Sequence, residues 1–155
     1  MSKITGTGIV VASGDVLTLD ESVPSHDLGE LVHLSDGRAF RYVLAGGTAL
    51  VRGNLIQSQA QATDSQSLIV AAAAIGALEI TTTDTTTVTA NEFAGGWVLV
   101  TGEASTGRGQ LLRIKSHPAA TAAVVTLTLE DPVQVALTAT SQIDLVHNPY
   151  NGVIQ

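Results

Sequence analysis

Residues 95–117 read Gly-Gly-Trp-Val-Leu-Val-Thr-Gly-Glu-Ala-Ser-Thr-Gly-Arg-Gly-Gln-Leu-Leu-Arg-Ile-Lys-Ser-His, and this stretch decides the fold class. Its two runs 97–101 and 110–115 are rich in apolar residues of the kind that favours strands. Glycines at positions 102, 107 and 109 interrupt the chain between these runs. Glycine-rich interruptions mark turns and loops. The stretch therefore predicts two strands joined by a loop, and we expect Trp97 to lie in the core.

The same alternation of strand and turn signals continues on both sides. Residues 31–43 place Asp36-Gly37 between two strand-like runs, which is the composition of a type I′ hairpin turn. Residues 123–129 alternate apolar side chains with threonine, at the period of two that a half-buried strand requires. Turn signals recur every 8–12 residues, which favours a sandwich or barrel over alternating strands and helices. We expect an all-β protein with a single antiparallel β-sandwich or barrel domain.

The limits of this domain follow from composition. Residues 1–29 combine short apolar pieces, four glycines and a polar stretch, so we expect an N-terminal arm or edge segment there. Residues 30–155 then form the β domain. Within the β domain, residues 68–78 are ambiguous. The four consecutive alanines 71–74 favour a helix, whereas the residues on both sides of them favour a strand, and we predict a strand. Further strands are expected over 79–90, with a turn at Asp84, and over 133–137 and 141–146.

Charge is scarce in this chain. Charged residues make up 14% of the 155 residues, while 45% are hydrophobic, and an average soluble domain has about 25% charged residues. Either the surface is neutral and polar, or much of it is buried against other subunits. We favour the second interpretation, because the cores of subunit interfaces are depleted of charge. We therefore expect a homo-oligomer.

Several classes of partner are excluded by the same numbers. The net charge is −7 and no basic stripe is present, so direct binding to nucleic acid is not expected. No run reaches 18 apolar residues, so no membrane partner is expected. The start of the chain has no signal-peptide pattern, which favours synthesis in a cytoplasm. Cysteine is absent, so disulfides and thiolate chemistry are excluded.

No motif for catalysis or for a cofactor stands out. The four histidines do not have the spacing of a zinc site, and no Gly-x-Ser-x-Gly elbow occurs. In the 102–109 loop, Gly102 and Gly107 have four residues between them, but the loop lacks the Lys-Ser/Thr that a phosphate loop requires. We therefore predict no catalytic residue, no metal and no cofactor. An enzyme would need a convergent His–carboxylate site, for which His117 is the best candidate.

Several sequence pieces taken together carry a resemblance. They are Asp36-Gly-Arg-Ala-Phe-Arg-Tyr, Ala45-Gly-Gly-Thr-Ala-Leu-Val, Ala94-Gly-Gly-Trp, Arg113-Ile-Lys-Ser-His-Pro and Asn148-Pro-Tyr-Asn-Gly-Val. Over residues 28–155 the chain resembles small virion structural proteins of tailed bacteriophages. The resemblance implies a capsid decoration (cement) protein, seated on the major capsid protein in the virion after assembly in the bacterial cytoplasm. A trimer is the expected oligomer, and the family carries no catalytic motif or cofactor to transfer.

Basic residues in an acidic chain are the candidates for contact with such a partner. We select five interface candidates, namely Arg38, Arg41, Arg108, Arg113 and Lys115. The alternative function is a tail or fibre module that binds glycans on a host surface. That function requires an exposed aromatic pair, so the accessibility of Trp97 distinguishes the two.

Overall fold

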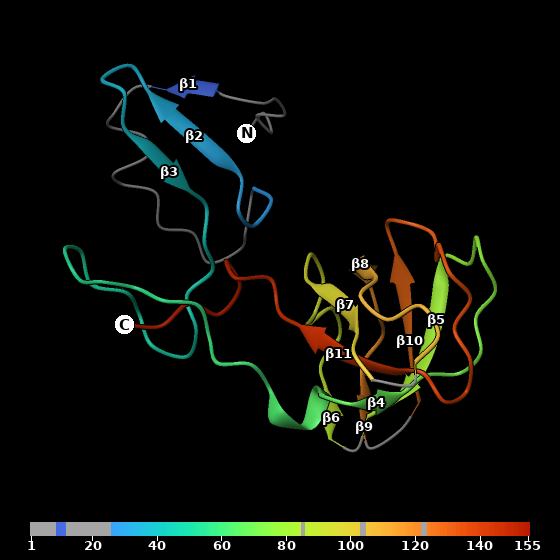
Figure 1. Cartoon of the computed structure of the whole chain (residues 1–155). Coiled ribbons are helices and arrows are strands. Elements are labelled where there is room, and N and C mark those ends of the chain that lie inside the picture. The colour runs from blue at the N-terminus through green and yellow to red at the C-terminus, as the bar shows by residue number, and fades with distance from the viewer. Residues whose placement is uncertain (1–8, 12–25, 85, 103–104, 122–123) are drawn as a thin grey trace. The chain divides into compact units, whose positions relative to one another are not determined.

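The computed structural model describes residues 9–11, 26–84, 86–102, 105–121 and 124–155, and the structural statements below refer to these residues. The protein is all-β, as the sequence predicts (Figure 1). Apart from one turn of 3-10 helix, η1 (Thr63–Ser65), every regular element in the described ranges is a strand. No helix long and apolar enough to cross a membrane occurs in them. The strands are β1 (Ile9–Val11), β2 (Leu31–Leu34), β3 (Ala39–Arg41), β4 (Leu68–Ile69), β5 (Glu79–Thr83), β6 (Thr87–Val88), β7 (Trp97–Val100), β8 (Leu111–Ser116), β9 (Ala120–Thr121), β10 (Val124–Leu129) and β11 (Gln142–Val146).

The chain divides into two compact units. The first, which we call the hairpin unit, comprises Met1–Gln59 and Pro149–Gln155, and the second, the barrel unit, comprises Ala60–Asn148. The division within the described residues therefore follows Gln59, and the C-terminal segment belongs with the N-terminal part of the chain. The boundary expected between residues 29 and 30 stays a prediction, because most of residues 1–29 lie outside the described ranges.

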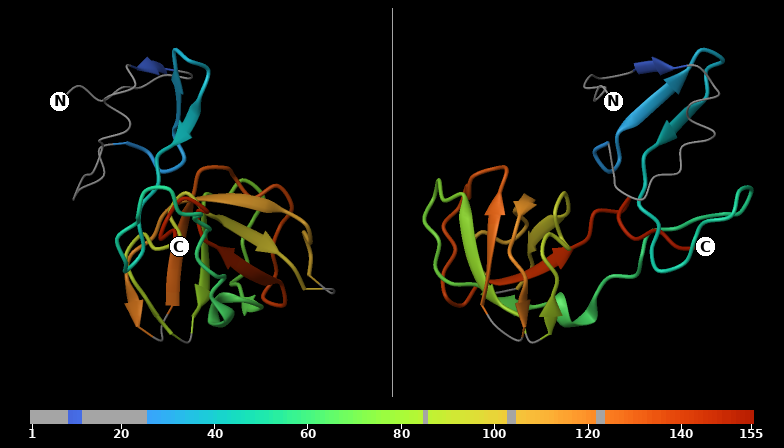
Figure 2. Two further views of the ribbon diagram at one scale, coloured as in Figure 1. Left: turned by 90° about the vertical axis from the view of Figure 1, so that its left-hand side faces the viewer. Right: turned by 180° about the vertical axis from the view of Figure 1, so that it is seen from behind.

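The main sheet of the barrel unit is antiparallel, with the strand order β4-β11-β7-β8-β10-β5, and β6 pairs with β9 in a separate two-stranded sheet. The two edges of the main sheet meet, since Val70, directly after β4, forms an antiparallel bridge with Thr82 of β5. The Ala71 amide donates to the Thr81 carbonyl at 2.8 Å, and the Thr82 hydroxyl donates to the Ile69 carbonyl at 2.8 Å. The sheet is thus a nearly closed barrel, seen from two sides in Figure 2. Closure removes exposed strand edges, which otherwise promote aggregation.

The core of the barrel follows from the alternation of side chains along each strand. Sixteen buried apolar residues form one cluster, and all of them belong to the barrel unit. On β7, Val98 and Val100 point inward, so Trp97 lies on the outer face and is only half-buried. The expectation that Trp97 is a core residue is wrong, because an uninterrupted apolar run does not show which parity faces inward.

A bulge between β8 and β10 decides the position of His117. Thr128 pairs with Ser116 and Leu129 pairs with Ile114, which leaves Lys115 as an extra residue on β8. An extra residue moves the following side chains to the opposite face. His117 is therefore turned inward and is 4% exposed, whereas an unbroken register would turn Ser116 inward.

The hairpin unit contains a second, three-stranded sheet of order β1-β2-β3. The β2–β3 hairpin is present as predicted, with Val32 opposite Phe40, but its turn is not type I′. Gly37 has φ +89°, and Asp36 is not among the positive-φ residues. The Gly37 amide donates to the Leu34 carbonyl at 3.0 Å, so a type I turn is followed by a left-handed glycine in a three-residue loop.

Of two other expected strands, one is shorter than predicted and one is absent. Within residues 68–78, only Leu68–Ile69 is a strand, and the following residues make single bridges and turns. Residues 133–137 form no strand, although Leu137 bridges Ala73. Both segments carry several apolar side chains that the sequence analysis assigned to strands. Val70, Val133 and Leu137 do reach the core, but they reach it from irregular backbone.

Candidate functional site

Phe93 packs against two histidines inside the barrel unit. Its ring is stacked on His147, with ring centroids 4.4 Å apart and an interplanar angle of 22°. His117 lies against the same ring in a tilted arrangement, at 5.8 Å between centroids. All three side chains are buried. The cluster joins the loop before β7 to the residues that follow β8 and β11, so it connects three segments distant in sequence.

The hydrogen bonds of His117 define its tautomer. The Phe93 amide donates to Nε2 of His117 at 3.0 Å, so this nitrogen is an acceptor. Nδ1 therefore carries the hydrogen and donates to the Pro118 carbonyl at 2.9 Å. The His117 amide in turn donates to Oδ1 of Asn91, which adopts a left-handed backbone with φ +60°. Both ring nitrogens are used within the fold, which is the arrangement of a structural histidine.

His147 differs from His117 in one respect. Its side chain is 8% exposed, and its Nδ1 is buried without a hydrogen-bond partner among the described residues. A buried polar atom without a partner costs free energy. Among the residues that the structure describes, no group of three His, Cys, Asp or Glu side chains is arranged to hold a metal ion. The cluster is therefore a packing element with one unsatisfied nitrogen.

Asp84 is the buried carboxylate of the barrel unit among the described residues. It lies at the turn predicted within the threonine-rich segment and has no exposed surface. One carboxylate oxygen accepts from the Ser65 hydroxyl at 2.9 Å. The other accepts from the amide and the hydroxyl of Thr86, at 2.9 and 2.7 Å. These hydrogen bonds connect the turn to η1. They give both carboxylate oxygens a donor, so a structural role is enough to explain why Asp84 is buried.

Two predicted interface residues lie in the hairpin unit. Arg38 forms an ion pair with Asp36, at 2.7 Å between Nη2 and Oδ2. Hydrogen bonds from Arg38 hold the pKa of the Asp36 carboxyl below its usual range and raise the pKa of Arg38. Arg41 donates to the Gly29 carbonyl at 2.7 Å, and its guanidinium lies 5.4 Å from the centre of the Tyr150 ring. Both arginines thus have partners within their own unit.

The other three interface candidates lie in the barrel unit. Arg113 lies opposite Trp97 across β7 and β8, with its guanidinium 5.6 Å from the indole centre. It also pairs with Glu130 at 3.0 Å. Lys115, in the bulge, and Arg108, in the β7–β8 loop, are exposed. No ion pair joins either of them to another described residue, so these two are the exposed cations of the barrel unit that have no ion-pair partner among the described residues.

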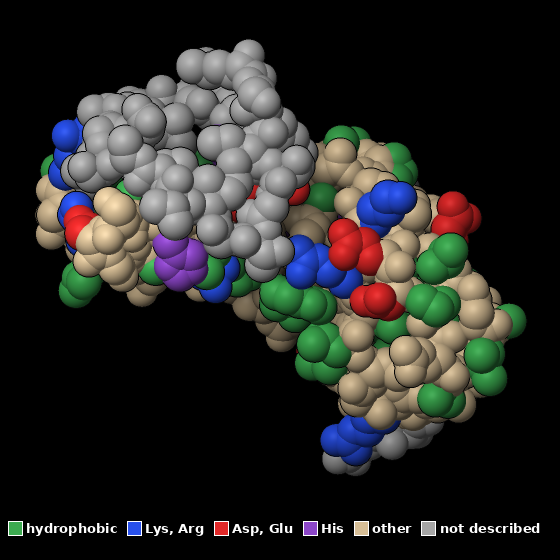
Figure 3. All heavy atoms as spheres, turned by 90° about the horizontal axis from the view of Figure 1, so that it is seen from above, with side chains coloured by type: hydrophobic (Ala, Val, Ile, Leu, Met, Phe, Trp, Pro, Cys, Tyr) green, Lys and Arg blue, Asp and Glu red, His purple; other side chains and the backbone are tan. Residues whose placement is uncertain are grey.

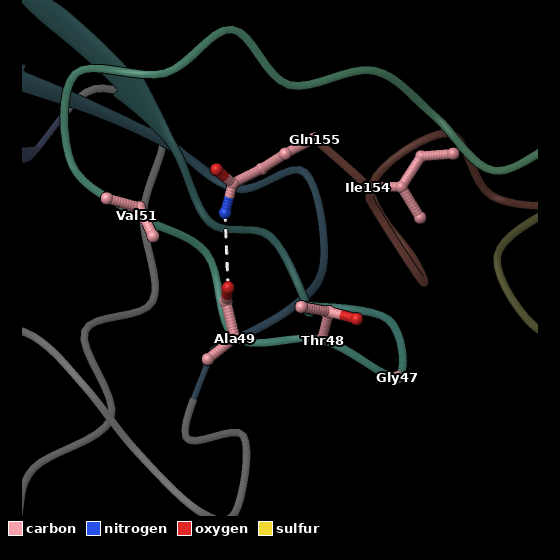
Figure 4. A pocket seen from close by; sticks show the side chains of 6 residues that line it. All are labelled: Gly47, Thr48, Ala49, Val51, Ile154 and Gln155. Carbon is pink, nitrogen blue, oxygen red and sulfur yellow. Dashed lines mark hydrogen bonds between the residues drawn. The ribbon is translucent and has the colours of Figure 1, made fainter.

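A surface that the sequence analysis missed lies in the hairpin unit. Five large apolar side chains of this unit are exposed, namely Leu44, Val51, Leu55, Ile56 and Ile154. Beside them is a hollow of about 420 Å³ lined by Gly47, Thr48, Ala49, Val51, Ile154 and Gln155 (Figure 4). The sequence contains one sign of this exposed apolar surface: residues 42–59 carry a single charged side chain, Arg52.

The barrel unit also exposes apolar side chains, but in another way. They are Ile69, Ile75, Leu78, Leu111, Val124 and Val135. On the face drawn in Figure 3, hydrophobic side chains are spread among uncharged ones. Apolar residues scattered in this manner are ordinary for a soluble surface.

Comparison of the chain with protein families, with curated proteins and with solved structures gives no match.

Proposed function

We propose that this chain is a virion structural protein of a tailed bacteriophage, and specifically a capsid decoration protein that binds the outer head shell. One observation carries the proposal beyond the sequence resemblance. Among its described residues, the hairpin unit buries only two large apolar side chains, Leu34 and Val153, and exposes five. The barrel unit, by contrast, contains the entire sixteen-residue core cluster.

This asymmetry favours a partner for the hairpin unit. Ordering a chain costs roughly 1–2 kcal/mol per residue in backbone entropy, which burial of apolar surface has to offset. A small unit with few buried side chains does not offset that cost by itself. Contact with another protein would supply the missing burial. A stable barrel joined to a unit that gains its burial from neighbours suits a protein that clamps adjacent capsid subunits.

The partners follow from this role. The major capsid protein is one, and further copies of this chain are the other, with a trimer as the favoured oligomer. On a shell the same contact is repeated many times, so that modest individual energies add to a large effect. Arg108 and Lys115 are the cations best placed to meet acidic groups on such a neighbour, because Arg113 is already paired with Glu130.

The test is binding to shells assembled from the major capsid protein of the same genome. The purified chain is mixed with these shells, and its co-sedimentation is measured as a function of concentration. Saturable binding on the outer surface supports the proposal, whereas a chain that never sediments with the shells overturns it. Lys115→Glu is expected to weaken binding more than Lys115→Ala, and equal binding by both variants would remove Lys115 from the interface.

The orientation of Trp97 gives some support to the alternative, a tail or fibre module that binds glycans. An indole on the outer face of a barrel can stack on a sugar ring. However, Arg113 lies over this indole, and the only other aromatic residue of the barrel unit, Phe93, is fully buried. Binding of the chain to a glycan array, lost in Trp97→Ala, would favour this alternative over decoration.

A further inference from the structure

We propose that Leu55 of one copy inserts into the hollow of the hairpin unit of a neighbouring copy, and that copies join head to tail through this contact. The hollow is the one lined by Gly47, Thr48, Ala49, Val51, Ile154 and Gln155. This inference rests on the proposed function, because it describes how copies of an oligomeric decoration protein would contact one another.

The wall of the hollow is fixed by the C-terminal residues. The backbone of Ile154 pairs with Gln57 through two hydrogen bonds of 2.9 Å, and Val153 bridges Ala45. The Gln155 side chain donates to the Ala49 carbonyl at 3.1 Å, as Figure 4 shows, and accepts from the Asn54 side chain at 2.6 Å. A hollow built in advance binds with a smaller ordering cost than one formed on contact.

Leu55 is the side chain that lacks a place in its own copy. It is 93% exposed, the highest value among the large apolar residues of the described chain. It follows Asn54 directly, and the Asn54 amide donates to the Val51 carbonyl at 3.3 Å. The turn at residues 51–54 is thus held against the hollow by the hydrogen bond between Asn54 and Gln155. The residue that follows this turn, Leu55, points into solvent. Full burial of a leucine is among the larger single contributions to association.

The chain carries both halves of the contact, an exposed Leu55 and a hollow, which favours a second copy as the occupant. Each copy has a net charge of −7, so contact between copies is least opposed in a region with little charge. Residues 42–59 contain both Leu55 and most of the hollow, and Arg52 is their single charge. Every copy consequently offers an apolar projection and an uncharged hollow on the same unit.

A contact between two different patches of the same chain is heterologous. Such contacts close into rings when the rotation between copies permits, or otherwise continue as filaments. A closed ring of three copies is the form that agrees with the trimer expected for the proposed function.

The absence of cysteine makes this contact directly testable. Leu55→Cys and Thr48→Cys are made as two separate proteins, mixed, and oxidised under mild conditions. We expect a disulfide dimer that contains one chain of each kind, on a non-reducing gel, in excess of the homodimers of either variant alone. Ile75→Cys, an exposed apolar position in the barrel unit, is the matched control and should give little cross-linked product with Thr48→Cys.

Two results would overturn the inference. One is the absence of the mixed dimer, or a yield no higher than that of the Ile75→Cys control. The other is an unchanged oligomer in Leu55→Asp, measured by sedimentation velocity, because Leu55→Ala alone is expected to weaken self-association about tenfold or more. Binding of Leu55→Asp to capsid shells separates the two proposals: retained binding with an unchanged oligomer refutes this contact and leaves decoration intact, whereas retained binding without self-association supports both.

Discussion

The ring of His147 lies stacked on the ring of Phe93, 4.4 Å away, while its Nδ1 has no hydrogen-bond partner among the described residues. His117 also contacts the Phe93 ring, and both of its ring nitrogens are hydrogen-bonded. Two histidines that contact the same phenylalanine thus have opposite hydrogen-bonding states. Replacement by phenylalanine is therefore expected to change the free energy of unfolding differently at the two positions.

His117→Phe should destabilise the barrel by about 1–3 kcal/mol, because the buried Phe93 amide loses its acceptor. His147→Phe should leave the free energy of unfolding equal to or above that of the wild type, because an unsatisfied nitrogen is replaced by carbon in a ring that still stacks on Phe93. Urea unfolding followed by Trp97 fluorescence measures both. A loss in His147→Phe as large as that in His117→Phe would show that Nδ1 has a partner.

Asp84→Ala should reduce the free energy of unfolding by about 2–4 kcal/mol. The substitution removes the acceptor for the hydroxyls of Ser65 and Thr86 and for the Thr86 amide. Asp64→Ala, an exposed carboxylate on η1, is the control and should change stability by less than about 0.5 kcal/mol. Equal unfolding midpoints for the two variants would refute the structural role of Asp84.

Gly96→Ala should prevent the barrel from folding or cost more than about 4 kcal/mol. A Cβ at this position would collide with the Val146 carbonyl and would lie 2.9 Å from the Phe93 carbonyl, both of which are backbone atoms. Gly109→Ala meets no described atom, and its φ of +85° costs only about 1–2 kcal/mol in backbone strain. Thermal unfolding followed by circular dichroism compares them, and similar midpoints would contradict this account of β7.

Arg113→Ala should make Trp97 more accessible to acrylamide, because the guanidinium lies 5.6 Å from the indole centre. Lys115→Ala removes a cation from the same strand without uncovering the indole and should leave quenching unchanged. Since the chain has one tryptophan, the Stern–Volmer constant reports on this site alone. Unchanged quenching in Arg113→Ala would mean that the arginine does not cover the ring.

Much of the barrel could be predicted from the period-two pattern. Residues 124–129 alternate clearly, and Val125, Leu127 and Leu129 are buried as that pattern requires. The orientation of β7 could not be predicted in this way, because Trp97, Val98, Leu99 and Val100 are all apolar. Only the pairing with β8 and β11 decides that Val98 and Val100 face inward.

Other features depend on contacts that a sequence pattern does not contain. The bulge at Lys115, which turns His117 inward, arises from the register between β8 and β10. The hollow arises because Val153 and Ile154 bridge Ala45 and Gln57, about a hundred residues away in sequence. The scarcity of charge in residues 42–59 was visible, but without the fold it did not show that Leu55 is left exposed.

The central claim is that this chain decorates a phage head, and the most direct measurement is electron cryo-microscopy of capsid shells saturated with the purified protein. The account predicts density for a six-stranded barrel at symmetric positions on the outer surface, with the hairpin units of neighbouring copies in contact. Shells that stay bare at saturating concentration, or density confined to the tail of complete particles, would contradict it.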